Sequence, residues 1–72
     1  MVPVPIRCRI PDILHSIGKS QAWLADRTGL SKQRISDYVN LRRIPSLPIA
    51  YLIASVLKVN IEDLHVWEWQ QE

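Results

Sequence analysis

Apolar residues recur at helical spacing in two stretches of the chain. The first stretch lies near the N-terminus and has apolar residues at positions i, i+3, i+4 and i+7, which are Ile10, Ile13, Leu14 and Ile17. The second repeats this spacing and adds position i+8, with Ile49, Leu52, Ile53, Val56 and Leu57. Residues so spaced lie on one face of an α-helix. Each stretch therefore predicts an amphipathic helix, and the second, which is the more apolar, is expected at the centre of the core.

Between these stretches, capping residues and a glycine delimit two shorter predicted helices. Ser20 and Ser31 each stand directly before a segment with helical periodicity, where a serine hydroxyl can accept a hydrogen bond from a free backbone N–H. The predicted helices cover residues 21–28 and residues 32 to about 41. Gly29 can adopt the left-handed conformation that ends the first of them. Their inward-facing residues are Leu24, Ala25 and Thr28 in the first helix, and Ile35, Tyr38 and Val39 in the second.

The first and last predicted helices are delimited in the same way. Pro11 suits a first helical turn, where its missing N–H costs nothing. Ser46 can cap the second apolar stretch, with Pro48 tolerated in its first turn. Asn60 can cap a short fifth helix. Because strand-like alternation is confined to residues 66–69 and is too short there to define a strand, the predicted fold is all-α, a compact bundle of about five short helices.

The two ends of the chain are predicted to lie outside this bundle. Pro3 and Pro5 prevent a helix in residues 1–9, which we expect to form an N-terminal arm. Residues 66–72 are expected to form a C-terminal tail. Residues 10–65 are then the folded domain.

The composition is that of one small folded domain. The chain has 72 residues, of which 47% are hydrophobic and 22% charged, a balance too apolar for a disordered chain. Its single cysteine, Cys8, excludes an internal disulfide, and with His15 and His65 it makes too small a set for a metal site. No apolar segment is long enough to cross a membrane and no signal peptide is evident, so we expect a cytoplasmic protein. Because no Ser/His/Asp, paired-carboxylate or phosphate-loop pattern occurs, we expect neither enzyme activity nor a cofactor.

Charge is distributed unevenly along the chain, although the net charge is only +2. Residues 19–43 carry six cationic side chains against two carboxylates, a net charge of +4. Residues 44–72 have a net charge of −3. A basic middle segment beside an acidic end favours one surface that faces a polyanion.

The middle segment also has the organisation of a helix-turn-helix. A helix that ends at Gly29 is followed by a short connection and by a helix capped at Ser31. The small side chain of Ala25 lets the two helices approach closely. Leu30 and Ile35 are expected to fill the wedge between them. No single one of these features is specific to a helix-turn-helix. Their order, between two further predicted helices, is specific to it.

Together these motifs resemble the Cro/cI-type helix-turn-helix domain, the XRE family of small bacterial and phage regulators with a lambda-repressor-like fold. The matching motifs are Gln21-Ala22-Trp23-Leu24-Ala25, Gly29-Leu30-Ser31, Ile35-Ser36-Asp37-Tyr38, Pro45-Ser46, Leu57-Lys58-Val59 and Asp63-Leu64. The resemblance covers roughly residues 6–65. It implies a five-helix bundle that binds operator DNA, usually as a dimer, and mostly represses transcription. The chain departs from the family's frequent Glu-x-Gly after the third helix, where it has Val39 and Leu41.

The predicted third helix presents a polar face that suits DNA. At 100° per residue, Gln33, Asp37 and Asn40 lie opposite the apolar side, with Ser36 and Arg34 on the flanks. A glutamine such as Gln33 can pair bidentately with adenine, and an aspartate such as Asp37 can accept from cytosine. Cations can donate to guanine or to phosphate, although the helix dipole disfavours them in a first turn. The cations in this first turn are Lys32 and Arg34.

Contacts to the DNA backbone are expected at the edges of this face. The resemblance implies phosphate contacts from Gln21 and Ser31 at helix starts. Arg42 and Arg43 follow the third helix and are expected to contact the backbone. Arg7 and Arg9 could also reach DNA, although a disordered arm is the favoured interpretation. The full predicted set is Gln21, Ser31, Lys32, Gln33, Arg34, Ser36, Asp37, Asn40, Arg42 and Arg43.

Two classes of function stay open at this point. The first is a sequence-specific DNA-binding regulator, a repressor from a phage, prophage or mobile element, bound to an operator alone or as a homodimer. The second is a protein-interaction module, an antirepressor or an adaptor, which the low net charge, Asp37, Leu41 and the apolar tail favour. A third possibility, an antitoxin, combines the two classes. The tail either folds back and buries a tryptophan, or it presents Trp67 or Trp69 to a second copy or another protein.

Overall fold

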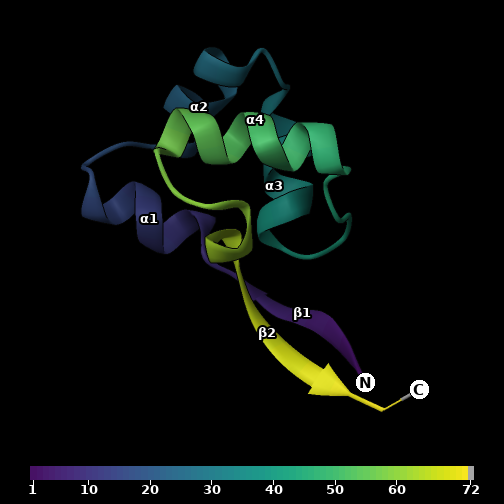
Figure 1. The fold of residues 1–72 in the computed structure, drawn as a ribbon. Coiled ribbons are helices and arrows are strands. Elements are labelled where there is room, and N and C mark those ends of the chain that lie inside the picture. Colours follow the sequence, from purple (N-terminus) through teal and green to yellow (C-terminus); the bar gives the residue numbers. More distant parts are fainter. Residues whose placement is uncertain (72) are drawn as a thin grey trace.

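The computed structural model describes residues 1–71 and combines a helical body with a two-stranded ribbon (Figure 1). Within these residues there are four α-helices, one 3₁₀ helix and one antiparallel sheet. In chain order they are β1 (Val2–Cys8), α1 (Ile10–Ser16), α2 (Gln21–Thr28), α3 (Lys32–Val39), α4 (Leu47–Leu57), the 3₁₀ helix η1 (Ile61–Leu64) and β2 (His65–Gln70).

The predicted capping residues begin and end the helices as expected. The Ser20 hydroxyl accepts a hydrogen bond from the backbone N–H of Trp23, and the Ser31 hydroxyl accepts one from that of Arg34, both at 3.1 Å. Gly29 ends α2 in the left-handed conformation, with a φ of 74°. Ser46 stands at the N-cap of α4, but its side chain makes no capping hydrogen bond within residues 1–71. Local hydrogen bonding therefore sets most of the helix boundaries.

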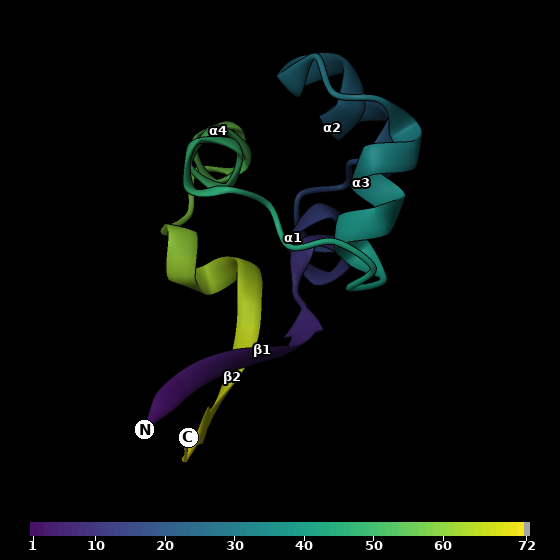
Figure 2. The same cartoon turned by 90° about the vertical axis from the view of Figure 1, so that its right-hand side faces the viewer.

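Each helical element contributes one fully buried side chain to a single core. These side chains are Ile10, Leu24, Ile35, Ile53 and Leu64, from α1, α2, α3, α4 and η1 in turn. Figure 2 looks along α4 and shows α2 and α3 lying to one side of it. The apolar faces predicted from helical spacing are thus the faces that pack together. The apolar side of α3 packs against this core through Ile35 and Tyr38, and the opposite side of the helix faces solvent.

The prediction of an all-α bundle with five helices is wrong at its ends. The expected arm and tail pair with each other as β1 and β2, with Val2 opposite Gln70 and Cys8 opposite His65. The short helix after Asn60 is a 3₁₀ helix, although Asn60 and Asp63 form a capping box at its start. The prolines of residues 1–9 exclude a helix but remain compatible with an edge strand.

Two further predictions about the chain ends, a disordered arm and a tail folded over the helices, are also wrong. Arg7 forms an ion pair with Asp12 at 2.7 Å, and the Arg9 backbone N–H donates to the carbonyl of Leu64 at 2.7 Å, so the arm is ordered. The tail does not fold back over the helices to bury a tryptophan. Trp67 is 38% exposed and Trp69 is 61% exposed.

His65 gives the stability of this fold a dependence on pH. Its side chain is buried, its Nε2 has no hydrogen-bond partner within residues 1–71, and this burial lowers its pKa below the ordinary value of 6.5. As the pH falls below 6.5, the unfolded chain binds the proton before the folded chain does. We expect the free energy of unfolding to fall between pH 7 and pH 5, by about 1.4 kcal/mol for each unit by which the pKa is lowered.

Urea denaturation followed by circular dichroism at pH 7, 6 and 5 measures this dependence. His65→Phe should flatten it, because a phenyl ring has no proton to bind. His15→Gln changes the exposed histidine of α1 and serves as the matched control. A slope that survives His65→Phe unchanged would show that another group carries the effect.

Candidate nucleic-acid interface

A short, internally bonded turn sets the angle between α2 and α3. The Thr28 hydroxyl donates to the carbonyl of Leu24 at 2.8 Å and accepts from the backbone N–H of Leu30 at 3.3 Å. Gly29 makes the reversal, and Leu24 and Ile35 are fully buried beneath it. The arrangement is the predicted helix-turn-helix, with α3 held by its apolar side.

The outward side of α3 carries a connected network of the predicted contact residues. The Gln33 amide donates to Oδ1 of Asp37 at 3.0 Å, and Nε of Arg42 donates to the same oxygen at 3.0 Å. Nη2 of Arg42 also donates to the hydroxyl of Ser36 at 3.1 Å. Asn40 donates to the backbone carbonyl of Ser36 at 2.8 Å. Five of the ten predicted residues are therefore brought together on one face.

Asp37 organises this network through its charge. The hydrogen bond from Arg42 holds the pKa of the Asp37 carboxyl below its ordinary value, with a further contribution from Gln33. Asp37 is therefore ionised at neutral pH, and the adjacent guanidinium offsets its repulsion of phosphate. Because Oδ1 already accepts two hydrogen bonds, the predicted contact with cytosine would have to use the other carboxylate oxygen.

Gln33 keeps the two groups that an adenine edge requires. One N–H of its amide is bonded to Asp37. The amide oxygen and the second N–H form no hydrogen bond within residues 1–71, so they can still accept from adenine N6 and donate to N7. Asp37 thus restricts the rotamer of Gln33 without occupying its recognition groups. A side chain ordered in advance loses less conformational entropy on binding.

Arg34 lies on the flank of α3 rather than within the network. Its Nη2 donates to the hydroxyl of Tyr38 at 2.9 Å, and its guanidinium carbon lies 5.9 Å from the centre of the Tyr38 ring. Its Nε is buried and has no partner within residues 1–71. Lys32 is exposed at the start of the helix, and it makes no ion pair with another described residue. Around the axis of α3, the two cations therefore lie on opposite sides of the polar face, which we call the reading face. This face consists of Gln33, Ser36, Asp37 and Asn40.

The end of α3 shows how Leu41 replaces the family's glycine. Leu41 adopts a left-handed φ of 58°, its N–H donates to the carbonyl of Tyr38, and the Arg42 N–H donates to that of Asp37 at 2.9 Å. This is the Schellman pattern, in which glycine is usual. α3 ends at Val39, about two residues earlier than predicted. The turn forms although Leu41 carries a side chain, which makes a left-handed conformation less favourable than it is for glycine. The turn places Arg42 beside Asp37.

The remaining predicted contacts lie at the periphery of the site. Gln21 is exposed at the first residue of α2. The Ser31 oxygen accepts the capping bond from Arg34, which leaves its own O–H free to donate to a phosphate. Arg43 is exposed in the loop beyond α3. None of these three joins the network around Asp37.

A cationic cluster on α2 was not predicted from the sequence. Trp23 is half-buried, with Nζ of Lys19 at 5.4 Å and the guanidinium carbon of Arg27 at 5.5 Å from its ring centre. Cation–π contacts of this length hold both charges beside the indole. The signal was present, because the three residues are spaced four apart along the chain. The cluster adds two cations to the side of the helix-turn-helix.

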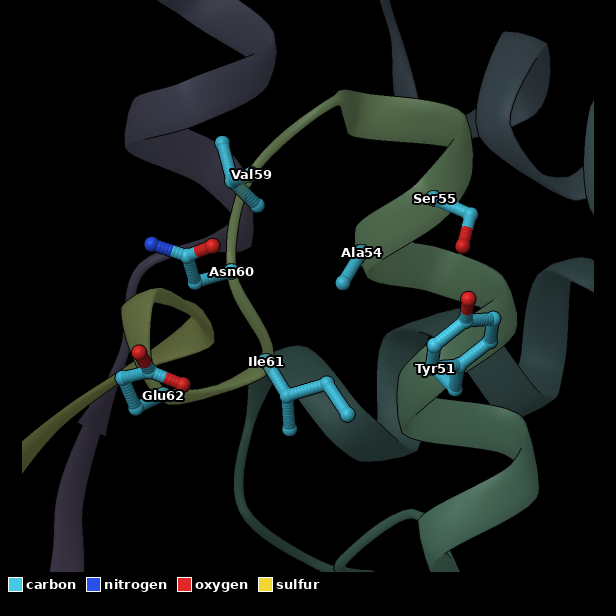
Figure 3. Close-up of a pocket in the computed structure, with 7 residues that line it drawn as sticks. All are labelled: Tyr51, Ala54, Ser55, Val59, Asn60, Ile61 and Glu62. Carbon is cyan, nitrogen blue, oxygen red and sulfur yellow. The ribbon is translucent and has the colours of Figure 1, made fainter.

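Other surfaces show less chemical organisation. A hollow of about 330 Å³ lies between α4 and residues 59–62 (Figure 3). Figure 3 shows the hydroxyls of Tyr51 and Ser55 pointing toward each other, whereas the side chains of Asn60 and Glu62 are directed away from them, so the polar groups of the two sides of the hollow do not converge. Among the described residues, no helix has both the length and the apolar character needed to cross a membrane. The network on α3 is the better-developed candidate site.

Comparison with known proteins points to the same region. Residues 16–64 match the family described as helix-turn-helix. The chain is 34% identical over 68 residues to the SPbeta prophage-derived uncharacterized HTH-type transcriptional regulator YotL of Bacillus subtilis, covering 93% of this chain and 85% of that protein. It is 36% identical over 67 residues to YopS, another such regulator from SPbeta, covering 90% of each. An uncharacterized HTH-type transcriptional regulator of Archaeoglobus fulgidus is 33% identical over 63 residues, covering 88% of this chain and 90% of that protein.

Proposed function

This chain belongs to the helix-turn-helix family, and from that premise we propose that it is a sequence-specific DNA-binding regulator of transcription. Helix α3 enters the major groove and its outward side reads base edges. The observation that carries this proposal is the network in which Asp37 orients Gln33 while leaving its recognition groups free. Three relatives named as transcriptional regulators support the class of function.

The charges around α3 support binding to the DNA backbone. Lys32, Arg34 and Arg43 border the reading face, and the helix starts at Gln21 and Ser31 offer polar groups to phosphates. Each phosphate that a protein cation neutralises releases counterions, so affinity should fall steeply with salt. In this proposal four side chains of the α3 network face the bases, namely Gln33, Ser36, Asp37 and Asn40. Arg42 keeps Asp37 in position through their hydrogen bond.

The finer proposal is a repressor of phage or prophage genes. Two of the relatives are named as derived from the SPbeta prophage, which supports this setting. A protein bound at an operator would block polymerase by occupying the promoter. Residues 10–65 would form the DNA-binding domain, with residues 1–9 and 66–72 flanking it.

The test is fluorescence anisotropy of labelled DNA from the upstream region of the protein's own gene, with a scrambled duplex in parallel. Near physiological salt, we expect the upstream fragment to bind about a thousandfold more tightly than the scramble. Both affinities should fall with rising salt. Equal, weak and salt-sensitive binding to the two duplexes would contradict self-regulation at that site. Absence of binding to either at low salt would contradict DNA binding altogether.

A further inference from the structure

A hollow with both apolar and cationic walls lies where the end of α1, helix α2 and the last turn of α4 meet. Its volume is about 570 Å³, against about 330 Å³ for the hollow in Figure 3. None of the residues that line it within residues 1–71 comes from α3. We call it the cationic groove and define it by three apolar and three cationic side chains, namely Ile17, Trp23, Val56, Lys19, Arg27 and Lys58.

The cations of the groove lack an anionic partner. Neither of the two ion pairs formed within residues 1–71 includes one of them, and no aspartate or glutamate in that range lines the groove. The Trp23 ring holds two of them close, with Nζ of Lys19 at 5.4 Å and the guanidinium carbon of Arg27 at 5.5 Å from its centre. Like charges gathered around one hollow repel one another, and an anion bound there would relieve this repulsion.

The spacing of the cations indicates the kind of anion. Lys19 stands before α2 and Arg27 in its last turn, so their backbones are separated by about the length of that helix, roughly 12 Å. Lys58 follows α4 and approaches from the other wall of the groove. A single carboxylate cannot pair with charges distributed in this way. A chain segment that carries several carboxylates can.

The apolar side chains of the groove add a second requirement. Ile17 is 44% exposed, and Trp23 and Val56 are only partly buried, so all three can still lose contact with water. Burying apolar surface favours association, whereas charges at the rim contribute more to the rate of encounter and to its dependence on salt. The groove therefore suits a segment that combines carboxylates with an apolar side chain.

The groove faces away from the surface assigned to DNA. At about 100° per residue, Trp23 lies about 200° around α2 from Gln21, which is expected to contact phosphate. A DNA backbone would also leave the apolar side chains of the groove without a partner. This placement relative to DNA rests on the proposed function, but the chemistry of the groove does not.

We propose that the cationic groove binds an acidic segment of a partner protein. Carboxylates of that segment pair with Lys19, Arg27 and Lys58, and one of its apolar side chains packs against Trp23 and Val56. A chain bound to DNA through α3 can thus hold a second protein on its opposite side. Because the contacts are partly electrostatic, the complex weakens as the salt concentration rises.

The test is an NMR titration of the 15N-labelled protein with the synthetic octapeptide Asp-Leu-Asp-Asp-Phe-Asp-Leu-Asp. One control peptide has asparagine in place of each aspartate, and the other has serine in place of each apolar residue. We expect the first peptide to bind more tightly than both controls and to shift the amides of Ile17, Trp23 and Lys58 together with the Trp23 indole N–H. Shifts confined to α3 would show that the peptide only mimics DNA and would overturn the proposal, as would absence of binding at millimolar peptide.

Two charge reversals that change the net charge equally separate the groove from the DNA surface. Lys58→Glu should weaken binding of the peptide by about 5- to 30-fold, because it replaces an attraction by a repulsion. It should leave the affinity for the operator duplex nearly unchanged. Arg43→Glu should do the reverse. Lys58→Gln, which removes the charge at the same position without reversing it, should lower peptide affinity in the same direction by a smaller factor.

The operator duplex and the oligomeric state complete the test. We expect the duplex and the peptide to bind together, so displacement of the peptide by the duplex would overturn the proposal. A change in the sedimentation of the protein alone on Lys58→Glu would assign the groove to a second copy of this chain and would also overturn it. Failure to bind the duplex by a protein that still binds the peptide would overturn the proposed function and leave the groove as a docking site.

Discussion

Ile53→Ala is expected to lower the free energy of unfolding by about 2–5 kcal/mol, the range found when a buried isoleucine is truncated. Ile53 is fully buried near the centre of α4, and truncation would leave a cavity within the core cluster. A chain of this size has a total stability of roughly 4–11 kcal/mol. The variant should therefore be close to unfolding at 37 °C.

Urea denaturation at 25 °C gives the free energies needed for the comparison. Tyr51→Ala is the matched control, because Tyr51 lies on the same helix and is 66% exposed. Its effect should stay within about 0.5 kcal/mol. Equal losses at the two positions would show that α4 is not packed as described here.

Gln33→Ala is expected to weaken binding to the protein's own operator by about 1–3 kcal/mol, or about 5- to 150-fold. Binding to a scrambled duplex should be unchanged. Gln33 is held by Asp37 with its amide oxygen and second N–H available, so its contribution is to base recognition. The substitution also removes one hydrogen bond to Asp37, but the ion pair between Asp37 and Arg42 remains to hold the end of α3.

Arg43→Ala separates base recognition from attraction to the backbone. Arg43 is exposed beyond α3, outside the Asp37 network. Its loss should weaken binding to operator and scramble alike and lower the slope of log affinity against log salt by about 1. Anisotropy titrations of both variants at several salt concentrations measure the two effects. If Gln33→Ala weakened both duplexes equally, Gln33 would be a backbone contact and the proposed reading face would be wrong.

The helical part of the fold was predictable because its signals are local. Ser20, Gly29 and Ser31 act through hydrogen bonds and backbone angles within a few residues, so their effects can be read along the chain. Helical spacing then identified the faces that meet in the core. The helix-turn-helix and the outward position of Gln33 follow from these two signals.

The ribbon was not predictable by the same means. Its strands come from the two ends of the chain, so their pairing cannot be read from either segment alone, and the alternation at residues 66–69 of β2 was too short to define a strand. Pro3 and Pro5 were interpreted as excluding a helix, whereas they also mark a blocked strand edge. The network around Asp37 was only partly predictable, because it depends on Leu41 adopting a left-handed conformation that a leucine does not favour.

The most direct test of the central claim is an NMR titration of the 15N-labelled protein with the operator duplex, following the backbone amides and the side-chain amide of Gln33. The largest shifts should fall on the start of α2, on residues 31–37 of α3 and on the loop through Arg43. The amides of β2, which lies outside the helix-turn-helix, should change least. Shifts concentrated on the ribbon or on α4, with those of α3 unchanged, would show that DNA is not bound through α3.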